Sequence, residues 1–162
     1  MTNVSRFKRS WLRKGLIIAA IIGVTGGGYG FYLFNMPHRD VVATKADGEI
    51  DAQALVDEFL KDGTAANAKY LDTEGESKVL AVSGTVSSKE TDLKGQTVVL
   101  LKAEGAEAGV RCSFTAETNT QADGLKTEDI VTIKGVIRAG ASFDADLDLY
   151  EHAVLEKCSL VP

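Results

Sequence analysis

Apolar residues form one long uncharged run near the start of the chain, from Leu16 to Phe34. As an α-helix these 19 residues would span about 28 Å, close to the hydrocarbon thickness of a bilayer. The run therefore predicts a transmembrane anchor over residues 15–35. Residues 16–34 of this anchor would contact the lipid bilayer.

The stub that precedes the anchor, residues 1–14, carries five cations and no acid: Arg6, Lys8, Arg9, Arg13 and Lys14. Basic residues beside a membrane helix stay on the cytoplasmic side, so we expect the chain from Asn35 onward to lie outside the cytoplasm. A cleaved signal peptide is the alternative, but the apolar run exceeds the usual signal core and no small-residue cleavage site follows cleanly. We predict a single-pass protein of a bacterial inner membrane, with its C-terminal domain periplasmic or extracellular.

Four glycines of the predicted anchor form two pairs with a spacing of four residues, Gly23 with Gly27 and Gly26 with Gly30. This spacing lets two helix backbones approach closely, so a homodimer through the anchor is one interpretation. The other is that glycine is simply common in membrane helices.

We predict a polar linker over residues 36–49. The segment after it has the periodicity of an α-helix. Apolar residues from Ala52 to Leu60 recur at intervals of three and four and form one stripe. Asp51 is suited to cap the N-terminus of this helix, and Gly63 to end it. We predict helices within residues 51–71 that pack one face on a sheet.

From residue 78 the apolar spacing changes to two, which is typical of β-strands. Five stretches show it: residues 78–86, 97–102, 110–115, 130–137 and 153–161. A polar, weakly helical segment, 117–126, separates the third stretch from the fourth, which is the order of an OB-fold barrel. We predict a mainly β domain over residues 50–162, in which a five-stranded OB-fold barrel over residues 78–161 carries the helical segment. An open antiparallel sheet covered by the helix is the alternative.

Charge divides the chain unevenly. All 23 acidic residues but only 13 of the 18 basic ones follow residue 34, so this part carries a formal charge of −10. An acidic domain repels nucleic-acid phosphates unless it has a focused basic patch, and the sequence shows none. Two of its five aromatic residues, Phe59 and Phe114, are expected in the core. These features argue against nucleic acid and favour an envelope protein as partner.

Several segments, spread over nearly the whole length, carry a family resemblance. They are the anchor ending in Asn35-Met36-Pro37-His38-Arg39-Asp40-Val41, the helix end Ala66–Leu71, Val82-Ser83-Gly84-Thr85-Val86, Gly109–Phe114, Val131–Gly135 and Leu155–Val161. In order and spacing the chain resembles the tRNA_anti-like OB-fold family in its membrane-anchored bacterial form. The resemblance implies an OB barrel and no established activity. The family name evokes nucleic-acid binding, by analogy with anticodon-binding OB domains.

The two cysteines, Cys112 and Cys158, fall in the third and fifth predicted strands, which are neighbours where an OB barrel closes. Outside the cytoplasm a disulfide is permitted, and closing so long a loop could stabilise the fold by about 4 kcal/mol. Two buried thiols that act as small apolar residues are the alternative, because parallel neighbouring strands suit disulfide geometry poorly.

The loop before the last strand is the candidate binding loop. Three acids alternate through it, Asp144, Asp146 and Asp148, but the glycine and glutamate of an EF-hand are missing, so we expect a solvated acidic rim. This loop often shapes the ligand face of OB barrels. The residues that we predict in the binding site are Arg138, Phe143, Asp144, Asp146, Asp148 and Tyr150.

Catalytic and cofactor chemistry has little support. His152 lies roughly where the haem chaperone of cytochrome c maturation, which has a similar layout, attaches haem, but the neighbouring residues do not match its histidine–tyrosine motif. Paired cysteine or histidine spacings are missing, and no nucleophile–base set stands out. We predict no catalytic site, metal or cofactor. The predicted function is a non-enzymatic binding module; a haem or metal chaperone and a single-stranded nucleic-acid binder are the alternatives.

Overall fold

A computed structural model describes residues 26–31, 41, 43–72 and 77–162 of the chain. The chain divides into two units, Met1–Arg39 and Asp40–Pro162, which are described separately. In the first unit, residues 26–31 are helical. Among the described residues no helix is both long and apolar enough to cross a membrane. Most of the predicted anchor, with Gly23 and the basic stub, lies outside the described residues, so the anchor and its dimer stay predictions.

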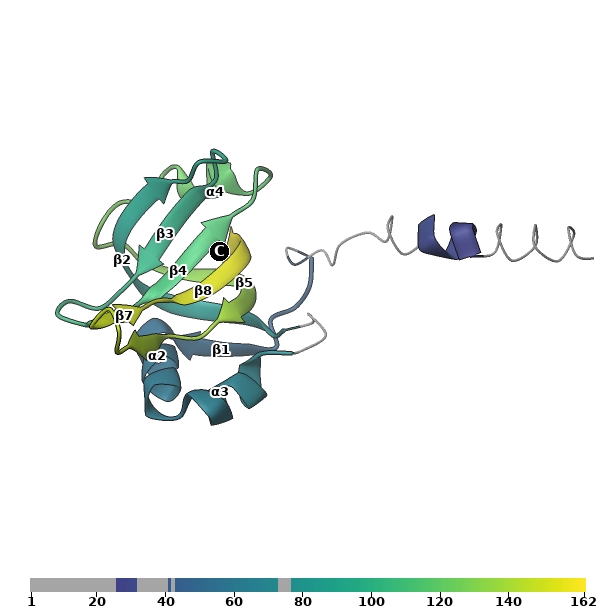
Figure 1. Cartoon of the computed structure of the whole chain (residues 1–162). Helices are drawn as coiled ribbons and strands as arrows, with labels where there is room; N and C mark the ends of the chain where they lie inside the picture. The colour runs from purple at the N-terminus through teal and green to yellow at the C-terminus, as the bar shows by residue number, and fades with distance from the viewer. Residues whose placement is uncertain (1–25, 32–40, 42, 73–76) are drawn as a thin grey trace, which may run out of the picture. The chain divides into compact units, whose positions relative to one another are not determined.

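The second unit is built on a closed barrel of five strands (Figure 1). These are β2 (Val79–Thr91), β3 (Thr97–Leu101), β4 (Val110–Phe114), β5 (Ile130–Ala139) and β8 (Ala153–Leu160). Around the barrel the order is β2-β3-β4-β8-β5, and β5 pairs back with β2. All neighbours are antiparallel except β4 and β8, which are parallel. This is the strand order of an OB-fold, so the predicted five-stranded barrel is confirmed.

Within the barrel, strand β2 pairs with two strands. Its first half pairs with β5 and its second half with β3. Gly84 lies just before the change of partner, and a Cβ atom there would approach the Cβ of Ala52 to 2.9 Å. Glycine therefore lets β2 pass close beneath the first helix as the barrel turns.

Inward side chains from all five strands fill the barrel. At most 1% of each of the following is exposed: Val82, Val86, Val99, Leu101, Val110, Cys112, Phe114, Ile133, Ile137, Leu155 and Cys158. Burial of one such aliphatic or aromatic side chain contributes about 1.5–3 kcal/mol relative to an exposed position. In β4 the outward residues Arg111 and Ser113 alternate with this core, which is the period of two that predicted the strand.

Two helices cover one end of the barrel: α2 (Ala52–Lys61) and α3 (Gly63–Tyr70) (Figure 1). The Asp51 carboxylate accepts hydrogen bonds from the backbone N–H groups of Gln53 and Ala54, so the predicted N-cap is confirmed. Asp62 follows α2 and caps α3 in the same way, through the N–H of Ala65.

The apolar stripe of α2 buries Ala52, Leu55, Val56 and Phe59. Its last predicted member, Leu60, is 38% exposed, so that part of the prediction is wrong. The helix ends one residue later, and Leu60 lies at the edge of the contact with the barrel.

A polar cluster joins the two helices. Glu58 Oε2 accepts a hydrogen bond from the Tyr70 hydroxyl at 2.9 Å and pairs with Lys69 Nζ at 2.7 Å. Hydrogen bonds from Lys69, and then from Tyr70, lower the pKa of the Glu58 carboxyl. The cluster fixes α3 against α2.

Residue 41 and residues 43–51 lie along the barrel, where the sequence predicted a linker through residue 49. Val41 is 3% exposed and packs with Val79 and Val136, and Lys134 Nζ donates to the Thr44 carbonyl at 2.9 Å. The strand β1 (Gly48–Asp51) then pairs in parallel with β2. Residue 41 and residues 43–51 together are called the strap.

Three further short elements are α4 (Asn119–Ala122), β6 (Ser142–Asp144) and β7 (Leu149–Glu151). The first lies within the segment predicted as weakly helical, 117–126, whereas β6 and β7 were not predicted. Lys89 Nζ donates to the carbonyl oxygens of Ala122, Asp123 and Leu125 and so fastens the end of α4 to β2. β6 and β7 pair as an antiparallel hairpin in the segment that we predicted as a loop.

Candidate functional site

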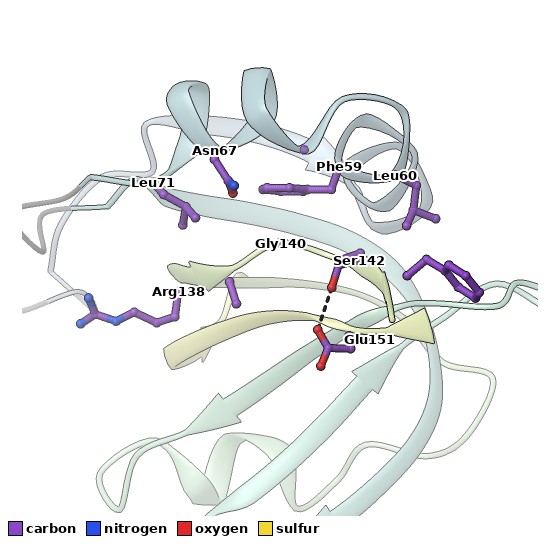
Figure 2. Close-up of a pocket in the computed structure, with 12 residues that line it drawn as sticks. Phe59, Leu60, Asn67, Leu71, Arg138, Gly140, Ser142 and Glu151 are labelled. Carbon is purple, nitrogen blue, oxygen red and sulfur yellow. Dashed lines mark hydrogen bonds between the residues drawn. The ribbon is translucent and has the colours of Figure 1, made fainter. Parts of the chain in front are cut away.

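A cleft of about 470 Å³ opens between the two helices and the chain that runs from the end of β5 into β6 (Figure 2). One wall consists of Phe59, Leu60, Gly63, Asn67 and Leu71 from the helical segment, and the other of residues 138–143 with Glu151. Its volume lies within the roughly 300–1,000 Å³ that is usual for ligand sites. We call it the helix–hairpin cleft.

The floor of the cleft depends on a contact between an aromatic ring and a glycine. The Phe59 ring lies directly against Gly140, and a Cβ atom on Gly140 would overlap the ring. Phe59 itself is 3% exposed and also contacts the Tyr70 ring, with centroids 5.7 Å apart. Any side chain at position 140 would therefore displace Phe59 and change the shape of the cleft.

Local hydrogen bonds and ring packing order the β6–β7 hairpin. Ser142 Oγ donates to Glu151 Oε2 at 2.7 Å, drawn as the dashed line in Figure 2. The Phe143 and Tyr150 rings pack across the hairpin with centroids 4.8 Å apart. The Asp144 carboxylate accepts from two backbone N–H groups of the turn that follows it.

The hairpin and the end of α2 expose several large apolar side chains. Phe143 is 48% exposed, Leu147 67%, Leu149 43% and Leu60 38%. Leu60 and Phe143 both line the cleft, and gathered apolar exposure of this kind marks interaction surfaces, whereas single exposed residues do not. The acids Asp146, Asp148 and Glu151 are exposed on the same hairpin.

The structure brings together only part of the predicted binding loop. Arg138 and Phe143 line the cleft, and Arg138 pairs with Glu156 at 3.1 Å. Tyr150 packs against Phe143, Asp144 holds the turn, and Asp146 and Asp148 are exposed beyond the cleft lining. The prediction missed Phe59, Leu60, Asn67, Leu71, Gly140, Ser142 and Glu151. The exposed end of the α2 stripe was the available signal for Leu60.

A second, smaller hollow of about 210 Å³ lies on the outer face of the barrel. Its lining residues are Ser88 and Glu90 of β2, Val98 and Leu100 of β3, Arg111 of β4, and His152 just before β8. We call it the barrel-face hollow. It shares no lining residue with the helix–hairpin cleft.

His152 is held in one tautomer at the edge of this hollow. Its Nδ1 accepts a hydrogen bond from the Gly109 N–H at 3.1 Å, so in the neutral ring the proton is on Nε2. Partial burial, and then the charges of Lys102 and Arg111, lower the pKa of His152. The ring is therefore neutral at physiological pH and presents an N–H donor.

The two cysteines lie in the barrel core as free thiols, both 0% exposed. Cys158 neighbours Cys112 across the parallel β4–β8 seam. Burial, and then the nearby Cys112 thiol, raise the pKa of Cys158. Both residues act as small apolar groups of the core, which is the second of the two interpretations of the sequence.

In the part of the chain that the structure describes, no three histidine, cysteine or acidic side chains gather closely enough to hold a metal ion. The absence of catalysis and of a cofactor stays a prediction from the sequence.

Comparison with known proteins places the chain in a family. The closed barrel defines the OB-fold class, and the profile of the tRNA_anti-like family matches residues 1–146. The chain belongs to the tRNA_anti-like family. No curated protein sequence matches it.

A solved structure shares this fold. It is a Klebsiella pneumoniae protein that carries the provisional description of a nucleic acid-binding lipoprotein. The match has a TM-score of 0.52 and 16% sequence identity, and it covers 78% of this chain and 100% of that one. At this identity the likeness shows the fold alone.

Proposed function

We propose that the protein is a membrane-anchored OB-fold module outside the cytoplasm, which binds a polypeptide segment of an envelope partner without catalysing a reaction. The observation that carries the proposal is the helix–hairpin cleft. It is an open hollow with an apolar floor, beside apolar side chains that the fold leaves exposed. Asn67, Ser142 and Glu151 line its walls and could pair with the backbone of a bound segment.

Charge complementarity favours a basic segment with an apolar anchor residue. The hairpin exposes Asp146, Asp148 and Glu151, and the chain after residue 34 carries −10. The cation in the cleft wall, Arg138, is paired with Glu156. A partner that places an apolar side chain between Phe143 and the helices would set neighbouring lysines or arginines against these acids.

The proposed location rests on the sequence. The basic stub and the uncharged run, residues 16–34, favour an anchor with its N-terminus in the cytoplasm. A reporter fused to Pro162 should be accessible from outside the cytoplasmic membrane. A reporter protected inside the cell would overturn the location.

Photocrosslinking of the full chain in intact cells tests the cleft. A photoreactive residue at Leu60 or Phe143 should give one and the same crosslinked polypeptide. The matched control is Leu93, which is fully exposed in the turn between β2 and β3 and should not give this product. Equal products from all three positions, or none from the two cleft positions, would contradict the proposal.

Reversal of the rim charges sharpens the test. The double variant Asp146→Lys and Asp148→Lys should reduce the crosslink several-fold if the partner segment is basic. Asp123→Lys, at an exposed position after α4, is the control. An unchanged crosslink in the double variant would exclude the charge preference while leaving the cleft in place.

Binding of single-stranded nucleic acid is the second candidate, favoured by the description of the Klebsiella pneumoniae protein. OB barrels bind strands with a basic groove and stacked aromatic rings. The acidic charge of this chain argues against it. Oligonucleotide binding that falls steeply with salt would replace the polypeptide proposal.

A further inference from the structure

The barrel-face hollow takes no part in the proposed function, and it is polar at both ends. Pairing of the strands sets its layout: Leu100 lies between Ser88 and Arg111 in one cross-strand row. Val98 lies between Glu90 and Ser113 in the next row. Residues paired in this way on one face are direct neighbours, so Ser88 and Arg111 flank the same apolar residue.

Hydrogen-bond donors converge at one end of the hollow. Arg111 is exposed, and among the described residues neither of the two ion pairs includes it. The Gly109 bond holds His152 so that its Nε2–H remains available. Lys102 packs against the same Gly109, because a Cβ atom on that glycine would lie 2.8 Å from the Lys102 Cβ. A cationic end therefore forms on a domain that is otherwise strongly acidic.

The rest of the hollow limits what can bind there. Val98 and Leu100 supply an apolar floor, and the Glu90 carboxylate lies at the other end. The volume of 210 Å³ is below that of sites that enclose a whole drug-sized ligand. The hollow is thus suited to one charged group and the atoms next to it. A second anionic group would face Glu90.

We infer that the barrel-face hollow binds a single oxyanion, a phosphate or a carboxylate, on a small molecule that is otherwise uncharged or cationic. The Arg111 guanidinium matches the paired oxygens of such a group, and the Nε2–H of His152 and the Ser88 hydroxyl supply further donors. Glu90 accepts a hydrogen bond from a hydroxyl or ammonium group of the same molecule. The inference is independent of the partner proposed for the helix–hairpin cleft.

A nucleic-acid strand fits this hollow less well. A strand brings a phosphate at every nucleotide, whereas the hollow places Glu90 at the end opposite its cationic end. Strand-binding OB faces also stack bases on aromatic rings, and the lining includes no phenylalanine, tyrosine or tryptophan. We therefore treat strand binding as an outcome that would overturn the inference.

Titration of the full chain, solubilised in detergent, tests the inference by two-dimensional NMR of the backbone amides. The probes are orthophosphate and O-phosphoethanolamine for phosphate, β-alanine for carboxylate, and pyrophosphate and a short oligonucleotide as polyanions. At least one single-oxyanion probe should shift the Gly109 and Arg111 amides and saturate. The phosphate and carboxylate arms distinguish which group is bound.

Variants assign the binding to named residues. Arg111→Gln should weaken binding by about tenfold or more, because it removes a charge-assisted pair of hydrogen bonds. Arg111→Lys keeps the charge without the fork and should show an intermediate loss. Lys126→Gln, an exposed position outside the hollow, is the control and should bind like the wild type. Unchanged amide spectra outside the hollow check that each variant is folded.

Glu90→Gln tests the selectivity for one anion. It should raise the affinity for pyrophosphate relative to orthophosphate several-fold, because the repelling carboxylate is gone. The inference fails if no single-oxyanion probe saturates or if Arg111→Gln binds like the wild type. It also fails if pyrophosphate or the oligonucleotide binds the wild type more tightly than the single-oxyanion probes do.

Discussion

The helix–hairpin cleft and the barrel-face hollow belong to one small domain but are built in different ways. Elements added to the barrel, α2, α3 and the β6–β7 hairpin, form most of the cleft, and the exposed charges of the hairpin are acidic. Barrel strands themselves form most of the hollow, and its cationic end contrasts with the charge around it. The first surface is suited to a polypeptide and the second to a small anion.

The comparison shows two ways in which a fold can fix a site. Strand register places the side chains of the hollow, so their relative positions follow from the barrel itself. The cleft depends on a few contacts between separate elements, above all that of Phe59 with Gly140. Changes to those contacts should therefore alter the cleft and leave the hollow intact.

The largest expected effect is that of Phe59→Ala. The side chain is buried at the base of the cleft, so its removal should lower the free energy of unfolding by about 3–5 kcal/mol. Urea unfolding would measure the loss. Phe143→Ala is the control, since that ring is half-exposed, and should cost about 1 kcal/mol or less. Equal losses in the two variants would show that the cleft floor is not built as described.

Gly140→Ala should have the next largest effect. The added methyl group overlaps the Phe59 ring, so we expect a loss of about 1–3 kcal/mol in the free energy of unfolding, together with a reshaped cleft. Gly124→Ala is the matched control, because nothing lies within 4 Å of a Cβ atom there, and it should change stability by no more than about 0.5 kcal/mol. Equal changes in the free energy of unfolding of the two variants would show that Phe59 can move away from the added methyl group.

A pH dependence should distinguish the hollow from the cleft. The pKa of His152 is lowered in the folded protein, so as pH falls below about 6.5 the unfolded chain takes up the proton first and stability decreases. His152→Gln should lack this part of the decrease. Thermal midpoints of the two proteins between pH 8 and pH 5 would test it, and parallel curves would contradict the described contacts of His152.

The smallest expected effect belongs to the polar cluster of the helices. Hydrogen bonds from Lys69 and Tyr70 lower the pKa of Glu58, so its stabilising contribution is present above about pH 4.5 and is lost as pH falls through the lowered pKa. Both ends of the ion pair are substantially exposed, which limits the contribution. The stability difference between wild type and Glu58→Gln should disappear in acid. A constant difference would show that the charge of Glu58 is not involved.

The barrel was predictable because its strands show apolar runs or alternation, which is clearest in β4. In β4, Val110, Cys112 and Phe114 face the core while Arg111 and Ser113 face out, and the sequence displays this period directly. Few sheet topologies are compatible with five strands in this order and a link after the third. β1 was not predicted, because its four residues are too short for a pattern and gain their partner only from β2.

The site was only half predictable. Arg138 and Phe143 were recognised because the loop before the last strand often shapes the ligand face of OB barrels. The hairpin was not predicted, because the three alternating acids indicated a solvated loop. The contact between Phe59 and Gly140 joins residues far apart in sequence, and no local pattern marks it. Arg111 and His152 likewise line one hollow only because β4 and β8 lie side by side in the barrel.

The strap limits the distance between the barrel and the predicted membrane anchor. On the proposed topology, only residues 35–40 remain between the end of the apolar run and Val41, where the strap begins. Even fully extended, that short tether reaches at most about 25 Å. The barrel would then stay within a thin layer next to the lipid. A partner deeper in the envelope would have to approach that layer in order to bind.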